Sequence, residues 1–325
     1  MRAGGFGTVT IVGCVEEAVV SDLVPGGVLR AAINLGNPVL AQGTAAVPSG
    51  VSVEIARELG VRLGVRVELI GCGAARESLA ALVRGGADIC FLAIEPARAA
   101  EVAFTAPYVL IEGVYVVRED SGLTALADID REHVRIGVNE GSAYDLFLSR
   151  TLRHAVVVRA PDGIGAFCEQ GLEAAAGIRQ VVSGFAARTA GFRVIEERFM
   201  QIRQAVGVTR VHAPGTVRFL AAAVEELKAS GFISDALQRS GQDRSLVAPP
   251  EQPPGSPAGM WRSLAWPEIR RQPPLRTQVD RDLLAEFRLG ECEIGRDLLR
   301  RQVALRDFPQ QLSGLRDRTG DRPLY

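Results

Sequence analysis

Short apolar runs alternate with segments of helical spacing between residues 27 and 245. In the first half of this region the apolar positions predict three strands and three helices. In chain order they are a strand over 29–35, a helix over 51–63, a strand over 65–70, a helix over 75–83, a strand over 87–92 and a short helix that begins at Pro96. This order of strands and helices indicates a largely parallel sheet covered by helices.

A second round of the same kind follows a polar stretch near residue 120. The predicted strands lie over 114–117, 134–138, 155–159, 173–176 and 206–208. The predicted helices lie over 143–152, 161–169, 179–190, 215–228 and 232–239. Two units of similar size, joined near 116–121 and 200–206, indicate an α/β protein with two lobes around a cleft.

We expect the first lobe to comprise 27–116 plus 206–245, and the second to comprise 117–205. Ligands in open α/β sheets lie beyond the carboxyl ends of the strands. The turns that follow strands are therefore the places to look for functional residues.

The two ends of the chain differ from this pattern. Residues 1–26 form a leader or a weak signal: an arginine and a short, glycine-broken apolar run precede Cys14, as in a lipoprotein signal, and a cytosolic leader is the alternative. Residues 246–325 begin with a proline-rich linker and continue as a charged tail, for which we expect short helices over 280–289 and 294–305 or disorder. No stretch of the chain reaches the roughly 18 apolar residues that a membrane span requires.

The charges balance almost completely. The 37 basic and 38 acidic side chains leave a net charge of −1, which argues against a nucleic-acid-binding surface or a polybasic membrane anchor. All the basic residues except Lys228 are arginine, so a single arginine is weak evidence unless its position is unusual.

The familiar catalytic and cofactor motifs do not occur in the sequence. It contains no phosphate-binding glycine–lysine loop, and no histidine or cysteine group has the spacing of a zinc site. The five scattered cysteines suggest no disulfide framework. We therefore expect neither a metal nor another cofactor.

The turn after the strand over 87–92 carries the most specific candidate. Pro96 suits the first position of a helix, which places Arg98 in the first turn, where a cation opposes the helix dipole. An arginine there can hold a carboxylate. The alternative is an exposed arginine that pairs with Glu95 or Glu101.

Three further turns are candidates. Ser142 and Asp145 resemble a capping box at the start of a helix, while Gly141 would let the backbone approach an anion near Ala143. Asn37 offers a donor and an acceptor but stands in an ordinary turn sequence. Arg179 follows a predicted buried strand and faces either the cleft or solvent.

Several motifs together resemble bacterial solute-binding protein family 3, the amino-acid receptors of ABC importers. Residues 87–98 read ADICFLAIEPAR and residues 104–108 read FTAPY, where the family has an A-D strand, I-T-P-x-R and F-S-x-P-Y. Residues 50–63 resemble the family's G-F-D-V-D-L-A helix, and residues 116–122 read VVREDSG before LADI at 126–129. The resemblance covers about residues 27–245.

This resemblance implies a type II periplasmic-binding-protein clamp without catalysis. Arg98 matches the arginine that pairs with the ligand's carboxylate, and Gly141 to Ala143 match the turn that completes the carboxylate site. Val114–Val117 and Ile202–Gln204 would lie near the two crossings between the lobes. It also implies a monomer that is periplasmic or lipid-anchored and partners an ABC transporter permease, with no nucleic acid; a cytoplasmic location is the alternative.

The sequence departs from the family at several positions of the expected site. Glu95 stands where the family has threonine, Ala93 where it has serine or threonine, and Val39 or Leu40 where an aromatic residue covers the ligand. Near Ile178 no aspartate is present to bind an α-ammonium group. The ligand is thus expected to be a small carboxylate, either an amino acid or an organic acid.

Two other functions stay open at this point. A carboxylate at Glu95 would allow acid–base chemistry, as in a dehydratase-like enzyme on the same fold. The weak export signal would also suit a cytosolic sensing module.

Overall fold

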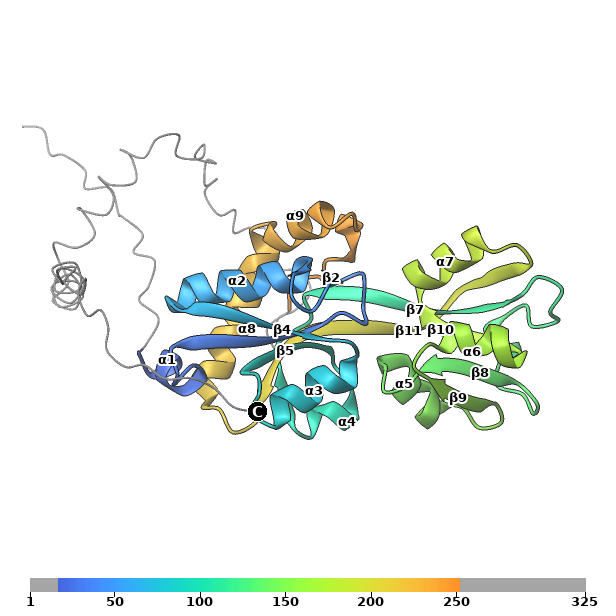
Figure 1. Ribbon diagram of the computed structural model, residues 1–325, viewed down its shortest axis with the longest axis horizontal. Helices are drawn as coiled ribbons and strands as arrows, with labels where there is room; N and C mark the ends of the chain where they lie inside the picture. The colour runs from blue at the N-terminus through green and yellow to red at the C-terminus, as the bar shows by residue number, and fades with distance from the viewer. Residues whose placement is uncertain (1–16, 252–325) are drawn as a thin grey trace, which may run out of the picture. The chain divides into compact units, whose positions relative to one another are not determined.

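A single mixed sheet runs through residues 17–251, the part of the chain that the computed structural model describes (Figure 1). Its strand order is β4-β1-β5-β11-β7-β10-β8-β9, and β6 pairs with β11. These strands are β1 (Val28–Asn34), β4 (Arg66–Cys72), β5 (Ile89–Ala93), β6 (Val102–Phe104), β7 (Val109–Arg118), β8 (Arg135–Asn139), β9 (Val156–Ala160), β10 (Ala174–Ile178) and β11 (Phe192–Thr209). A separate small hairpin consists of β2 (Gln42–Gly43) and β3 (Pro48–Ser49).

The first lobe is built on the parallel strands β4, β1 and β5. Successive residues of β5 point to opposite faces: Ile89 and Phe91 belong to one core cluster, and Cys90 and Leu92 to another. Its helices are α1 (Glu17–Leu23), α2 (Val51–Leu63), α3 (Ala75–Val83), α4 (Pro96–Ala99), α8 (Pro214–Ala229) and α9 (Phe232–Arg239). Because both faces are covered, every residue of β5 is buried.

The second lobe repeats this construction with the parallel strands β10, β8 and β9. Its helices are α5 (Ala143–Thr151), α6 (Gly163–Gln170) and α7 (Arg179–Arg188). Short 3₁₀ turns occupy Leu126–Asp128 and Arg244–Leu246. The expected α/β class with two lobes is confirmed.

Two long antiparallel strands, β7 and β11, join the lobes. β7 pairs with β10 from Gly113 to Val116, and its register with β11 shifts between Ile195 and Met200. A Cβ atom at Gly113 would lie 2.8 Å from the Met200 side chain and 2.9 Å from the Phe199 ring, so a larger residue there would force these side chains to shift. The sequence predicted only residues 114–117 of β7 and residues 206–208 of β11 as strand, so both strands are longer than expected.

Helix α1 occupies part of the segment expected to be a leader. Leu23 is fully buried and Val19 nearly so, which makes residues 17–24 part of the first lobe's core. Asp22 joins α1 to the start of α8: its Oδ2 accepts hydrogen bonds from the Thr216 hydroxyl at 2.6 Å and the Ala213 N–H at 3.0 Å. Residues 1–16, which include Cys14, lie outside the described residues.

We predict that Asp22→Ala lowers the free energy of unfolding by about 1 kcal/mol near neutral pH, as expected for the loss of a helix-capping carboxylate. The Thr216 hydroxyl, against the opposing effect of burial, holds the pKa of Asp22 below its usual value. A lowered pKa stabilises the fold above the unfolded-state value, and this stabilisation is lost as the pH falls through the folded-state value.

Urea unfolding at about pH 7 and about pH 3 tests this linkage. The difference between wild type and Asp22→Ala should shrink in acid, whereas Asp120→Ala, which removes an exposed carboxylate, should behave as wild type at both values. An equal difference at both pH values would contradict the role given to the Asp22 charge.

The only lysine of the chain fastens the segment that follows α9. Lys228 is buried, and its Nζ donates to the carbonyls of Pro107 at 3.2 Å and Pro249 at 3.0 Å, while it pairs with Glu225 at 2.5 Å. Residues 246–251, expected to begin the linker, instead pack on the first lobe: Ala248 is buried and its N–H donates to the Tyr108 carbonyl at 3.0 Å. Residues 252–325 lie outside the described residues, and with them the rest of the expected linker, the tail and the helices over 280–289 and 294–305. Within 17–251, no helix combines the length and the apolar character needed to cross a bilayer.

Candidate functional site

A cavity of about 230 Å³ lies between the two lobes. Its lining includes the residue that ends, or directly follows, each of six strands. In the first lobe these are Asn34, Gly73 and Ala93, after β1, β4 and β5; in the second they are Asn139, Pro161 and Ile178, after β8, β9 and β10. The cavity therefore lies where the carboxyl ends of the sheet's two sets of parallel strands face each other, the usual ligand position in α/β folds.

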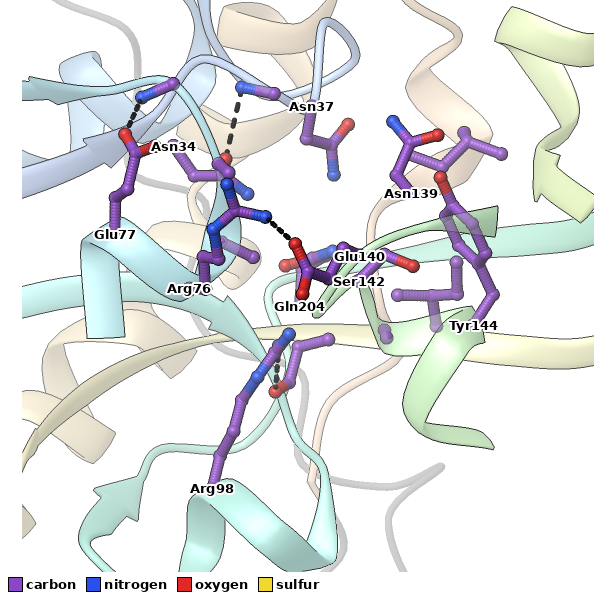
Figure 2. A pocket seen from close by; sticks show the side chains of 18 of the residues that line it. Asn34, Asn37, Arg76, Glu77, Arg98, Asn139, Glu140, Ser142, Tyr144 and Gln204 are labelled. Carbon is purple, nitrogen blue, oxygen red and sulfur yellow. Dashed lines mark hydrogen bonds and ion pairs between the residues drawn. The ribbon is translucent and has the colours of Figure 1, made fainter. Parts of the chain in front are cut away.

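Arg98 is the most buried charged side chain of this cavity, with 3% of its surface exposed. Pro96 begins α4 as the sequence predicted, and Arg98 extends from that helix toward the turn before α5 (Figure 2). Its guanidinium donates to the carbonyl of Ala93 at 3.2 Å and, across the cleft, to the carbonyl of Gly141 at 2.9 Å. Burial lowers the pKa of Arg98, and the nearby Glu95 charge opposes this effect. Two neutral carbonyl partners leave the positive charge available to an anion.

The turn before α5 completes the wall opposite Arg98. Gly141 adopts φ 71°, and its N–H donates to Oδ2 of Asp145 at 2.9 Å, while the Ser142 hydroxyl accepts from the Asp145 N–H at 3.1 Å. The capping arrangement expected from the sequence is confirmed. The N–H groups of Ala143 and Tyr144 have no acceptor within residues 17–251 and remain free at the helix start.

The Asp145 carboxylate lies close to the turn before α5, and its charge is paired. Arg159 donates to its two oxygens at 2.9 and 3.1 Å, and Ser149 donates to it at 3.0 Å. The repulsion that Asp145 would exert on an anion is therefore largely cancelled by Arg159.

Asn37 lines the cavity with 4% of its surface exposed. Its Oδ1 accepts from the Val39 N–H at 3.2 Å, which leaves the amide nitrogen for other partners. Val39 and Leu40 lie in the hydrophobic core and do not line the cavity, so neither takes the place of an aromatic cover over a ligand.

Glu95 and Arg179 do not belong to the cavity lining. Glu95 is buried and accepts from Arg150 of the second lobe at 2.5 Å. Arg179 donates to Glu112 of β7 and to Glu196 of β11, each at 2.7 Å, where the two strands join the lobes. Of the expected site residues, Arg98, Asn37, Ser142 and Ala143 line the cavity and Gly141 borders it through its carbonyl.

Several cavity residues were not identified from the sequence. Arg76 and Glu140 form an ion pair of 2.7 Å across the cleft, and Gln204 of β11 is almost fully buried beside Arg98 (Figure 2). Tyr144 points its ring into the cavity, and burial raises the pKa of its hydroxyl to about 12. A neutral phenol of this kind can donate a hydrogen bond to a ligand at every physiological pH.

The comparisons with known proteins identify a family for most of the chain. The family model for bacterial extracellular solute-binding proteins, family 3, matches residues 29–242. No curated protein matches this chain.

Solved structures share the fold at low sequence identity. An amino acid ABC transporter substrate-binding protein from Streptococcus pneumoniae, bound to L-arginine, is 16% identical with a TM-score of 0.58, over 72% of this chain and 100% of that one. A mutant of the protein ArgBP from T. maritima is 19% identical with a TM-score of 0.57, over 69% and 99% of the two chains. An ancestral amino-acid-binding protein, described as a precursor of cyclohexadienyl dehydratase, is 16% identical with a TM-score of 0.57, over 68% and 98%.

Proposed function

Because this chain belongs to the bacterial extracellular solute-binding proteins of family 3, we propose that it is the substrate-binding component of an ABC importer and holds a small carboxylate between its lobes. The resemblance inferred from the sequence motifs is confirmed by the family match. The observation that carries the proposal is Arg98, a buried cation in the interlobe cavity with only carbonyl partners.

Two sets of donors from opposite lobes would meet at the carboxylate. The Arg98 guanidinium supplies a planar fork that matches a carboxylate, and the free N–H groups of Ala143 and Tyr144 mark the positive end of α5. A ligand that bridges them stabilises the closed arrangement of the lobes. Closure in turn removes water from the ion pair and strengthens it relative to an exposed salt bridge.

The arginine-bound relative from Streptococcus pneumoniae supports an amino acid as one ligand class. The cavity lining supports a wider choice, since its residues Ile178, Ile202 and Ala93 are apolar and offer no carboxylate to an α-ammonium group. We therefore keep organic acids within the proposed class.

Catalysis is the weaker proposal. The ancestral relative named as a precursor of a dehydratase motivates it, as does Glu95 in the place of threonine. However, the Glu95 carboxylate is engaged by Arg150 and does not line the cavity, so it is badly placed to exchange a proton with a ligand. The proposal includes a location outside the cytoplasm, a monomeric state and docking on a permease, all of which rest on the family match.

Isothermal titration calorimetry of the full chain with a panel of amino acids and organic acids tests the proposal. We expect saturable binding of at least one small carboxylate with one site per chain and no chemical change in the ligand. Neutral amides of the same acids should not bind, because Arg98 would have no anion to pair with. A panel in which no carboxylate binds, or in which a bound acid is converted to product, would contradict the proposed function.

A further inference from the structure

The charged side chains around the cavity fall into neutral pairs, with two exceptions. Three arginines each pair with a carboxylate: Arg76 with Glu140 at 2.7 Å, Arg150 with Glu95 at 2.5 Å, and Arg159 with Asp145 at 2.9 Å. The two cavity-lining charges that remain are Arg98 and Glu77. A ligand in the cavity therefore meets one cation and one anion that have no ion-pair partner in the described part of the chain, Arg98 and Glu77.

Glu77 lies in the first turn of α3, and one of its oxygens accepts from the Gly73 N–H at 2.7 Å. This bond satisfies a backbone donor at the helix start and holds the carboxylate against the cavity wall. No arginine, lysine or histidine within residues 17–251 forms an ion pair with Glu77. Its negative charge and its second oxygen are consequently available to a ligand cation.

Arg98 and Glu77 approach the cavity from different elements. In Figure 2, Arg98 reaches the cavity from α4 and Glu77 reaches it from α3, beside Asn34, with the Arg76–Glu140 ion pair between them in this view. A ligand that reaches both groups therefore carries its positive charge away from its carboxylate.

The surroundings of Arg98 also disfavour a positive charge directly beside the ligand's carboxylate. Ala93, whose carbonyl accepts from Arg98, is apolar, Ile178 and Ile202 also line the cavity, and Arg179, next in sequence to Ile178, is bound to Glu112 and Glu196. An ammonium group placed here would lose its water without gaining an anionic partner, which is costly.

Resting on the proposed function, we infer that the ligand is a zwitterion with separated charges: an ω-amino or ω-guanidino acid whose carboxylate pairs with Arg98 and whose cationic end pairs with Glu77. Such a ligand has no net charge and matches the single cation and single anion of the lining. A basic α-amino acid would match both ends but would bury a second ammonium group without a partner.

Calorimetric titration with 4-aminobutanoate, 5-aminopentanoate and 6-aminohexanoate tests the inference. Each is compared with its 2-amino isomer, which has the same composition, and with the unsubstituted acid. We expect one of the ω-amino acids to bind about 3- to 5-fold tighter than both counterparts, because Glu77 is exposed and an ion pair with it stays partly hydrated.

The variant Glu77→Gln should remove this preference, so that the ω-amino acid and the unsubstituted acid bind with about the same affinity. Glu68→Gln, which removes an exposed carboxylate of β4 outside the cavity, should leave every affinity as in wild type. Equal binding of ω-amino and unsubstituted acids, tighter binding of a 2-amino isomer, or an ω-preference that survives in Glu77→Gln would overturn the inference and leave the carboxylate proposal standing. The absence of binding by every acid in the panel would instead count against the proposed function itself.

Discussion

Replacing Arg98 with methionine should reduce the affinity for the carboxylate ligand by about 100-fold or more, the loss expected when a charge-assisted bidentate pair is removed from a buried site. Methionine fills a similar length with an apolar side chain, so the buried position remains occupied. The carbonyls of Ala93 and Gly141 lose a donor but face a cavity that water can enter. The fold should therefore survive.

Calorimetry on three variants separates the possible causes of this loss. Arg98→Met removes the charge, Arg98→Lys keeps the charge without the planar guanidinium, and Arg66→Met removes an arginine elsewhere in the protein. Lysine keeps the positive charge but lacks the planar fork, so we expect an intermediate affinity. Arg66 is exposed at the start of β4, outside the cavity, and its replacement should change nothing. Unchanged affinity in Arg98→Met, with circular dichroism and thermal unfolding like those of wild type, would show that the ligand is held elsewhere.

Arg150→Ala should open the lobes and weaken ligand binding. Only 4% of the Glu95 side chain is exposed, and its partner Arg150 comes from the other lobe, where it also lies over the Phe147 ring at 5.1 Å. Without Arg150, closure would bury an unpaired carboxylate. Because Arg150 itself is partly exposed, we expect the closed state to lose about 2 kcal/mol, less than for a fully buried pair.

Small-angle X-ray scattering and ligand titration measure the two consequences of this change. The radius of gyration of the ligand-free protein should rise, and affinity should fall roughly 30-fold, which corresponds to that free energy. The double variant Arg150→Ala with Glu95→Gln should recover part of the affinity, since closure would then bury a neutral amide. If the scattering and the affinity of the single variant are identical to those of wild type, the Arg150–Glu95 pair does not hold the lobes together.

Helices with a clear apolar period could be predicted closely from the sequence. The expected ranges 51–63 and 75–83 coincide with α2 and α3, because their apolar residues recur at helical spacing and glycines follow them. The long strand β11 could not be predicted, since Arg193, Glu196 and Arg198 interrupt its apolar pattern. Arg193 pairs with Val117 of β7, and Glu196 and Arg198 lie where the register of the two strands shifts, which are long-range features that local periodicity does not encode.

Only those residues of the candidate site that stand in a recognisable strand-to-helix turn could be predicted from the sequence. Arg98 and Ser142 stand at helix starts after strands, where local geometry already favours a ligand. The cross-lobe pairs could not be found in this way, because Glu95 meets Arg150 and Arg76 meets Glu140 only when the lobes come together. These distant partners make Glu95 a contact between the lobes that does not line the cavity.

A crystal structure of the protein with the tightest-binding carboxylate tests the central claim most directly. We predict that the carboxylate lies between the lobes, within hydrogen-bonding distance of the Arg98 guanidinium and of the N–H groups of Ala143 and Tyr144. Arg98 should then exchange its bond to the Gly141 carbonyl for one to the ligand. A ligand bound outside this cavity, or inside it with its carboxylate away from Arg98, would contradict the account.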